Sequence, residues 1–536
     1  MSQDPTAPSP AGPSPTGRRR FLASGAAALG AATAGQLAAP APALGATPYV
    51  PRPVHRPTAA PLPDGLFTLG VASGDPLPDG VVLWTRLAPD PLNGGGMPER
   101  TVEVEWQVAA DSRFRHIVRR GTTRAEPAYG HSVHADVRGL APGRDHWYRF
   151  RAEGQLSPTG RTRTAPPPHS TGTLRLALAS CQNWQHGYFS AYADMAAQDP
   201  DAVLFVGDYI YESGPSATAV RRHEGTGEPV TLEQYRNRYA QYRADPDLAR
   251  MHASAPWIVT FDDHEVDNDY AGEIPQDPDR QPHEAFVPRL TAAYQAFYEH
   301  MPVRATAVPS GPHIRVHRRL DFGRLARLQV LDTRQHRSDQ ATTQEGAQSP
   351  LLTMLGASQK RWLVEGLRDS PARWNLIASQ IMLAETDLLP GVGKRWYYDA
   401  WDGYQTERNE LLGELAAIRN PVVLSGDRHL TMVSDLRRDY ADPASRTIGA
   451  EFVGCSISSN GDQDQDAFRA QWDPLRPDNP HWKLLDAHRG YHLFDIGRDG
   501  IDAQVRTVET VLSPASPVRP PVRLRVDEGT PGVRLV

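Results

Sequence analysis

Residues 202–212 read A-V-L-F-V-G-D-Y-I-Y-E, an apolar run that ends abruptly in a carboxylate and a phenol. Two later segments have the same form: residues 257–265 read W-I-V-T-F-D-D-H-E, and residues 422–429 read V-V-L-S-G-D-R-H. Short apolar runs followed at once by polar residues are typical of buried parallel strands, whose carboxyl ends carry binding sites. The pattern predicts an α/β fold with its functional side chains at one edge of a sheet.

The chain from residue 170 onward alternates such strands with helical stretches. Further strands are expected at residues 174–180, 325–331 and 375–378, ending in Cys181, Asp332 and Ser379. Helices are expected at residues 188–197, 358–367 and 407–418.

Residues 66–165 carry only β signals. Val102, Val104, Trp106 and Val108 alternate with polar residues, which indicates a strand with one buried face. A Leu-x-Pro corner precedes an aromatic strand, as in fibronectin-like sandwiches, although His146 holds the position of the usual tyrosine.

The predicted domains follow from these changes in pattern. Residues 1–46 are expected to be a signal peptide, 47–65 a proline-rich lead-in, 66–165 an N-terminal β-sandwich of fibronectin or immunoglobulin type, and 170–536 the catalytic α/β domain.

The N-terminus contains G-R-R-R-F-L at residues 17–22, a twin-arginine pattern with Arg18 and Arg19 as the pair. A weakly apolar run and a cleavage site near Ala43 or Ala46 follow. A disordered basic arm would carry more polar residues. We therefore expect export by the twin-arginine translocase to a secreted, extracytoplasmic location.

Composition excludes several classes of protein. The 536 residues are 39% hydrophobic and 22% charged, which is ordinary globular composition, and the formal net charge is −6. Because the arginines are scattered and the net charge is negative, no specific nucleic-acid binding is expected. We expect a monomer.

Three clusters of polar residues are candidates for a metal site. The four ionisable groups at residues 262–265 would repel one another without a cation. Asp427 and His429 are spaced so that both can point the same way. Asp208 and Tyr211 could reach one ion, although a capping aspartate and a packed tyrosine would explain this pair equally well.

The two cysteines, Cys181 and Cys455, allow two interpretations from the residues alone. In an oxidising compartment they could form a disulfide, or both could be buried thiols.

Taken together, these segments resemble the alkaline phosphatase D family, a branch of the calcineurin-like metallophosphoesterases. The resemblance runs from about residue 66 onward and implies a four-layer α/β catalytic sandwich after the N-terminal β domain. Its blocks are F-T-L-G-V-A-S-G-D-P (67–76), V-L-W-T-R (82–86), A-S-C-Q (179–182), G-D-Y-I-Y-E (207–212), D-D-H-E (262–265), L-D-T-R (331–334), S-G-D-R-H (425–429), N-P-H-W-K (479–483) and R-G-Y (489–491).

Carried over to this sequence, the resemblance implies a di- or trimetal centre. Asp208 is implied as the bridging carboxylate, and Cys181, Tyr211 and His429 as ligands of Fe3+, for which thiolate and phenolate are strong donors. Asp263 and Asp427 stand where relatives have Asn and His, so their oxygens suit Ca2+.

The resemblance also implies roles in catalysis. His264 is implied as a histidine that is not a ligand and that stabilises charge or protonates the leaving oxygen. Glu212, Asp262, Asn268, Arg334 and Arg489 are weaker candidates.

The expected function is a secreted metal-dependent phosphoesterase that hydrolyses phosphate monoesters by attack of a metal-activated water or oxide, for phosphate scavenging. The alternatives are a phosphodiesterase or phospholipase D with the same metal centre, and an inactive secreted glycan-binding protein. A covalent mechanism through Cys181 is disfavoured because no histidine is adjacent.

The long insert between the Asp208 and Asp263 motifs is expected to form a wall of the entrance. Its tyrosines, Tyr235, Tyr239 and Tyr242, could then form an aromatic rim that admits a lipid.

Overall fold

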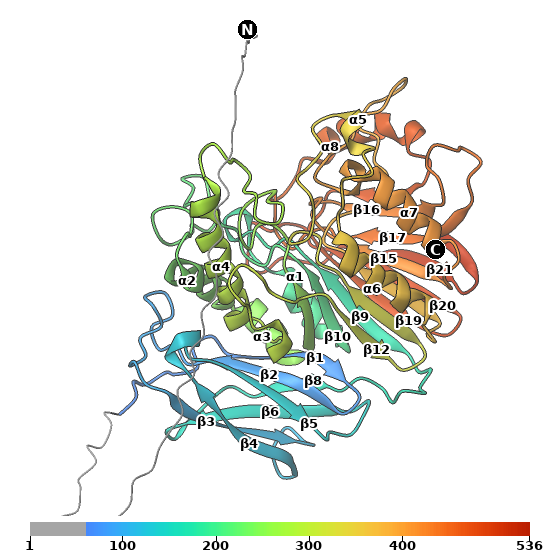
Figure 1. Cartoon of the computed structure of the whole chain (residues 1–536). Coiled ribbons are helices and arrows are strands. Elements are labelled where there is room, and N and C mark those ends of the chain that lie inside the picture. Colours follow the sequence, from blue (N-terminus) through green and yellow to red (C-terminus); the bar gives the residue numbers. More distant parts are fainter. Residues whose placement is uncertain (1–60) are drawn as a thin grey trace, which may run out of the picture. The chain divides into compact units, whose positions relative to one another are not determined.

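Two β-sheets packed face to face organise the chain in the computed structural model, which describes residues 61–536 (Figure 1). The predicted signal peptide and most of the proline-rich lead-in lie outside the described residues. Both sheets bring parallel strands to a common edge, where the predicted site residues follow the strands.

The first sheet has ten strands in the order β22-β21-β20-β19-β9-β10-β11-β1-β2-β5. Its centre is parallel: β9 (Leu174–Ala179), β10 (Ala202–Val206) and β11 (Pro256–Thr260) pair in register. The flanking strands are β1 (Val71–Leu77), β2 (Gly80–Arg86), β5 (Ser132–Arg138), β19 (Gly490–Ile496), β20 (Gly500–Thr507), β21 (Val522–Asp527) and β22 (Thr530–Leu535).

The second sheet has seven strands in the order β12-β13-β14-β15-β17-β16-β18. Strands β13 (Ala326–Val330), β14 (Trp374–Ala378) and β15 (Pro421–Ser425) are parallel and buried. The remaining strands are β12 (Arg318–Phe322), β16 (Thr431–Arg437), β17 (Thr447–Val453) and β18 (Trp482–Asp486).

Helices cover the outer faces of the two sheets. The helices α1 (Ala191–Ala197), α2 (Leu232–Arg243), α3 (Pro246–Ser254) and α4 (His283–His300) share a core with β10 and β11. On the other side, α6 (Gly356–Arg368) and α7 (Gln405–Leu415) share a core with β14 and β15 (Figure 1). The short helices α5 (Gln344–Ala347) and α8 (Gln465–Trp472) lie in connections. The four-layer α/β prediction is confirmed.

The N-terminal region forms a sandwich that shares a sheet with the rest of the chain. Strands β3 (Val102–Ala109), β4 (Ile117–Ala125), β6 (Asp145–Ala152), β7 (Gln155–Leu156) and β8 (Gly160–Arg163) form a third sheet. This sheet packs on β1, β2 and β5, which belong to the ten-stranded sheet because β1 pairs with β11. The expected boundary near residue 170 stays a prediction, since residues 60–536 form one compact unit.

His146 in β6 takes the position that the corner pattern assigned to it. Its Nε2 lies 3.5 Å from the carbonyl oxygen of Ala141, so the imidazole points back to the preceding turn as a corner tyrosine would.

Among the described residues, no helix combines the length and the apolar character needed to cross a bilayer.

Candidate metal centre

The predicted site residues converge where the parallel strands of the two sheets end. Cys181 follows β9, Asp208 follows β10 and Asp263 follows β11, all in the ten-stranded sheet. Asp427 and His429 follow β15 of the facing sheet. Because the sheets pack face to face, their carboxyl edges bring the two groups together.

The backbone is held in an uncommon conformation at four of these residues. The φ angles of Cys181, Asp208, Asp427 and His429 are 57°, 60°, 69° and 53°. Left-handed backbone costs energy for a residue with a Cβ, and such residues cluster at functional sites. Gly207, at φ 110°, allows the Asp208 turn to pack closely, since a Cβ there would lie 2.7 Å from the backbone nitrogen of Asp262.

One group of donors surrounds Tyr211. Ligand atoms of Cys181, Asp208 and His429 lie within 4.8 Å of one another. The Tyr211 hydroxyl lies 2.8 Å from Asp208 Oδ2 and 2.9 Å from His429 Nε2, and Ser459 Oγ donates to it at 2.6 Å. A thiol, a phenol, an imidazole and a carboxylate therefore lie close together, and these are the residues that the resemblance implies as iron ligands.

A second group of donors contains only oxygen and one imidazole. Asp208, Asp263 and His264 form one compact cluster, and Asp262, Asp263 and Asp427 form another. Asp208 and Asp263 belong to more than one cluster, which is the arrangement that allows ions to share a carboxylate. Asp208 Oδ1 and Asp262 Oδ2 are buried without a hydrogen-bond partner among the described residues, which is costly unless a cation compensates.

The sequence did not point to two further carboxylates. Asp269 and Asp399 form a cluster with Asp263. Asp399 lies in the stretch W-Y-Y-D-A-W rather than after a strand, so no pattern distinguished it. Only the folded connection after β14 brings it to the site.

A buried arginine stands among these acids. The Arg334 guanidinium, which is fully buried, contacts Asp262 and lies 2.9 Å from Asp399. It also lies 3.6 Å from Asp263 and 3.7 Å from Asp427. Arg337, also buried, lies 2.6 Å from Asp399, so two arginines face four carboxylates and the cluster keeps an excess of negative charge.

Burial and mutual repulsion shift the acids of the site. Burial raises the pKa of Asp208 to about 7 and that of Asp262 to about 8. Burial and the nearby Asp208 also raise the pKa of the Cys181 thiol and of the Tyr211 phenol well above their ordinary values. Bound cations favour the deprotonated forms and would reverse these shifts.

The two histidines of the site differ in charge. Burial and the neighbouring His264 lower the pKa of His429 to about 3, so its imidazole is neutral and can donate a lone pair to a metal. Burial would also lower the pKa of His264, but Glu212 and Asp263 overcome it and raise that pKa well above the ordinary value. His264 Nδ1 lies 2.7 Å from Glu212 Oε2. Glu212 and Asp263 therefore favour the charged form of the His264 imidazole.

Several weaker candidates have structural roles. Arg489 is buried and donates to the carbonyl oxygens of His429 and Gly461, which fixes the loops around the site. Glu212 orients His264 and also accepts from the backbone N–H of Asn268 at 3.0 Å.

The expected aromatic rim is wrong. Tyr235, Tyr239 and Tyr242 are fully buried in the core between α2 and the ten-stranded sheet. Their spacing places them on the inner face of α2, where they pack rather than line an entrance.

The two cysteines are not joined. Cys181 and Cys455 are both buried free thiols. The disulfide interpretation is therefore wrong, and Cys181 lies among the donors around Tyr211.

Comparison with known proteins identifies the family. The sequence model of the PhoD-like phosphatase family matches residues 176–505, and that of its N-terminal domain matches residues 54–166. This chain belongs to the PhoD-like phosphatase family. The resemblance seen in the sequence is confirmed.

Individual relatives of this PhoD-like phosphatase support the same family membership. Alkaline phosphatase D of Bacillus subtilis (strain 168) is 44% identical over 465 residues, covering 84% of this chain and 79% of that protein. A solved structure described as the structure of PhoD has a TM-score of 0.85 at 43% identity, covering 89% of this chain and 93% of the other. The chain is a phosphoric ester hydrolase.

A distant structure shares the fold alone. The purple acid phosphatase PPD1 from yellow lupin seeds has a TM-score of 0.51 at 12% identity, covering 82% of this chain and 71% of the other.

The Glu212–His264 pair yields a direct prediction. In the metal-free protein, Glu212→Gln should lower the pKa of His264 by about 1 to 3 on the pH scale, because an adjacent anion favours the charged imidazole. Histidine NMR titration measures this. The control, Glu273→Gln, removes an exposed carboxylate from His283 and should leave His264 unchanged. An unaltered His264 pKa in Glu212→Gln would contradict the electrostatic assignment.

Proposed function

We propose that this phosphatase hydrolyses phosphate monoesters at a centre that holds Fe3+ and Ca2+. The observation that carries the proposal is the pair of buried, unpartnered carboxylate oxygens, on Asp208 and Asp262, within clusters of metal-ligating groups. A buried carboxylate oxygen that receives no hydrogen bond from the protein is available to coordinate a cation.

The donor chemistry supports two kinds of metal position. Cys181, Tyr211 and His429, with Asp208, offer the thiolate, phenolate and imidazole donors that suit Fe3+. Asp263 and Asp427, again with Asp208 nearby, offer the hard oxygens that suit Ca2+. Asp208 would be shared by the two metal positions, since its carboxylate lies in a cluster with Cys181 and His429 and in another with Asp263.

When bound, the ions would neutralise the charge of the phosphoryl group and lower the pKa of an attacking water. The chain's own residues do the rest. Asp263 accepts backbone N–H bonds from His264 at 3.0 Å and Asp269 at 2.8 Å, which hold its carboxylate in place. His264, whose charged form Glu212 favours, can stabilise charge on the leaving oxygen or donate a proton to it.

Preference for monoesters is inferred from charge. A dianionic monoester has a more favourable electrostatic interaction energy with a site of several cations than a monoanionic diester has. Arg334 and Arg489 are not counted toward this preference, because both are buried and already bind groups of the protein. The preference therefore rests on the ions and His264. The buried tyrosines of α2 remove the argument for a lipid entrance, and the intact donor set argues against an inert glycan-binding protein.

The proposed function includes export of the enzyme from the cytoplasm and a role in phosphate scavenging. They rest on the twin-arginine pattern at Arg18 and Arg19, and the product of the reaction would be inorganic phosphate.

The metal assignment predicts colour and composition. The active protein should contain iron and calcium by elemental analysis, and phenolate ligation should give a visible charge-transfer band. Tyr211→Phe should shift or abolish this band, whereas Tyr129→Phe, in the N-terminal sandwich, should not. A colourless active protein without iron, or activity that survives calcium chelation, would refute the assignment.

The substrate assignment predicts the ranking of esters. The specificity constant should be higher for p-nitrophenyl phosphate than for bis-p-nitrophenyl phosphate or phosphatidylcholine, measured in parallel on the same preparation. A higher value for either diester would overturn the monoesterase proposal and leave the metal proposal intact.

The role of His264 predicts a dependence on the leaving group. His264→Gln should lower turnover of an alkyl phosphate by about 10² to 10⁴-fold, the usual contribution of general acid catalysis, and turnover of p-nitrophenyl phosphate by less. Metal content should stay at the wild-type level. The control is His283→Gln on the surface. Loss of metal, or an equal loss of rate for both esters, would exclude the proposed role.

The export proposal predicts retention of a double variant. Replacing Arg18 and Arg19 together with Lys should leave the precursor inside the cell, while Arg20→Lys should not, because the receptor reads the guanidinium pair. Cell fractionation measures this, and normal secretion of the double variant would point to another route.

A further inference from the structure

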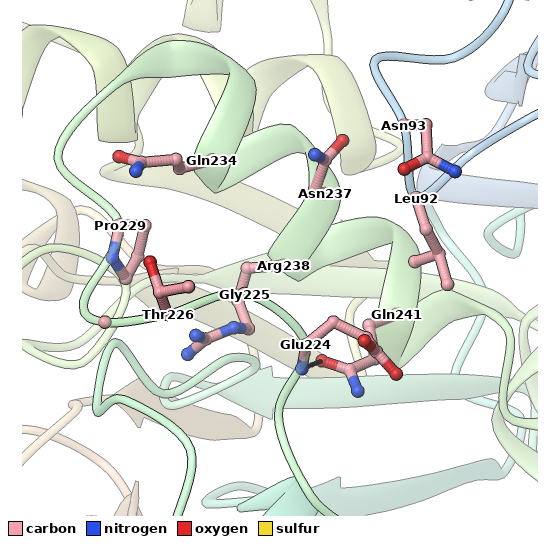
Figure 2. A pocket seen from close by; sticks show the side chains of 11 residues that line it. Leu92, Asn93, Glu224, Gly225, Thr226, Pro229, Gln234, Asn237, Arg238 and Gln241 are labelled. Carbon is pink, nitrogen blue, oxygen red and sulfur yellow. Dashed lines mark hydrogen bonds between the residues drawn. The ribbon is translucent and has the colours of Figure 1, made fainter.

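A cavity of about 470 Å³ lies in the insert between the Asp208 and Asp263 motifs. Figure 2 shows side chains from three segments around it: α2, the loop at residues 224–229, and the loop at residues 92–93 of the N-terminal region. None of these side chains belongs to the clusters at the metal centre.

Two amides on α2 present hydrogen-bond donors to the cavity. Gln234 Oε1 already accepts from the backbone N–H groups of Val230 at 2.9 Å and Thr231 at 3.0 Å. Asn237 Oδ1 accepts from the backbone N–H of Gly94 at 3.2 Å. Their side-chain NH2 groups have no partner in the part of the chain that the structure describes. Gln234 Oε1 already accepts two hydrogen bonds and Asn237 Oδ1 one, so both amides can offer their free NH2 groups to an occupant.

A buried cation stands beside these amides. Arg238, whose exposed fraction is 4%, lines the cavity. Its Nη1 donates to the carbonyl oxygens of Tyr211 and Ser213, but no carboxylate in residues 61–536 lies within ion-pair distance of it. By contrast, the equally buried Arg289 of α4 pairs with Asp267 at 3.1 Å. Glu212 and Glu228 favour the charge of Arg238 without pairing with it directly, so the guanidinium can still bind an anion in the cavity.

Groups that can accept a hydrogen bond lie elsewhere in the lining. Asn93 uses its Nδ2 to donate to Asp90 Oδ1 at 2.9 Å, which leaves its carbonyl oxygen available. The carboxylate of Glu224 has no ion-pair partner among the described residues. Figure 2 shows these two residues on the side away from Gln234 and the Arg238 guanidinium. The lining therefore offers both hydrogen-bond donors and hydrogen-bond acceptors to an occupant.

We propose that this cavity is a second binding site, separate from the metal centre, for a small polyhydroxylated phosphate such as a sugar or glycerol phosphate. Its phosphate group binds Arg238, Gln234 and Asn237, and its hydroxyls donate to Asn93 and Glu224. Guanidinium and amide donors are the groups that recognise phosphate oxygens, and the volume accommodates more than the phosphate alone. The assignment does not depend on the proposed function.

Isosteric variants test the site without removing its structural bonds. Gln234→Glu keeps the oxygen that caps α2, and Asn237→Asp keeps the oxygen that Gly94 requires, but each replaces a donor with a negative charge. Asn409→Asp, on the exposed face of α7, is the matched control. The probe is 3,4-dihydroxybutylphosphonate, whose C–P bond a phosphoesterase does not cleave.

The experiment combines a crystal structure with calorimetry. A crystal structure of the wild-type holoenzyme with the probe should show it in this cavity, whatever it does at the metal centre. Calorimetry should show a binding event that each variant weakens at least tenfold and that Asn409→Asp preserves. Methylphosphonate, which lacks the hydroxyls, should bind here more weakly.

Three outcomes would overturn the proposal. The first is a crystal structure in which the probe occupies only the metal centre. The second is a binding event that neither variant weakens, or that the control variant also weakens. The third is methylphosphonate binding in this cavity as tightly as the probe does.

Discussion

The concentration of buried carboxylates at the common edge of the two sheets is the constraint on which this molecule depends. Asp208, Asp262 and Asp263 follow strands of one sheet and Asp427 follows a strand of the other, and their side chains are largely or wholly removed from water. Arg334 supplies one positive charge to a group that carries several negative ones. A buried charge without a partner costs several kcal/mol, on the order of the whole stability of a domain. Cations bound at this edge would therefore offset a cost of burial as well as supply the chemistry.

The surrounding architecture keeps these acids in place. Four residues of the site hold left-handed backbone conformations, which persist only when the packing around them leaves no alternative. The N-terminal strands contribute to that packing, because β1 continues the sheet beyond β11. At Gly74 of β1 a side chain would collide with the backbone of Pro302 and Trp257, so this junction tolerates no Cβ. The N-terminal sandwich is therefore part of the scaffold of the site.

The insert that carries α2 links the metal centre to a different region of the molecule. The tyrosines of α2 pack in the core. Arg238 donates a hydrogen bond to the carbonyl oxygen of Tyr211 and also lines the proposed phosphate cavity. Tyr211 thus has its phenol in the metal centre and its backbone fixed by a residue of the second cavity. The two sites are chemically distinct, since one is rich in anionic oxygen and the other in hydrogen-bond donors.

The amino-acid sequence is sufficient to locate the central strands and the polar residues at their ends. Apolar runs with sharp polar ends predicted β10 at both of its bounds and β15 to within a residue at each end, because a buried strand must be apolar throughout and the residue after it is free to be polar. For the same reason the candidate donors from Cys181 to His429 could be named, with the family resemblance deciding among them.

The folded chain was needed to show which groups meet across the sheets and which face solvent. Asp399 and Asp269 lie in connections that carry no recognisable sequence pattern, so only the folded structure places them at the site. The effect of Glu212 on His264 also follows only from the folded structure, in which their side chains lie 2.7 Å apart. The three tyrosines that were expected to form a rim are core residues, and the two arginines that were weaker candidates for the site, Arg334 and Arg489, are buried. The periodicity of a sequence indicates which face of a helix or strand is buried, but it does not show which residues that face contacts. The charge of a histidine and the exposure of a tyrosine depend on neighbours that lie tens or hundreds of residues away in the chain.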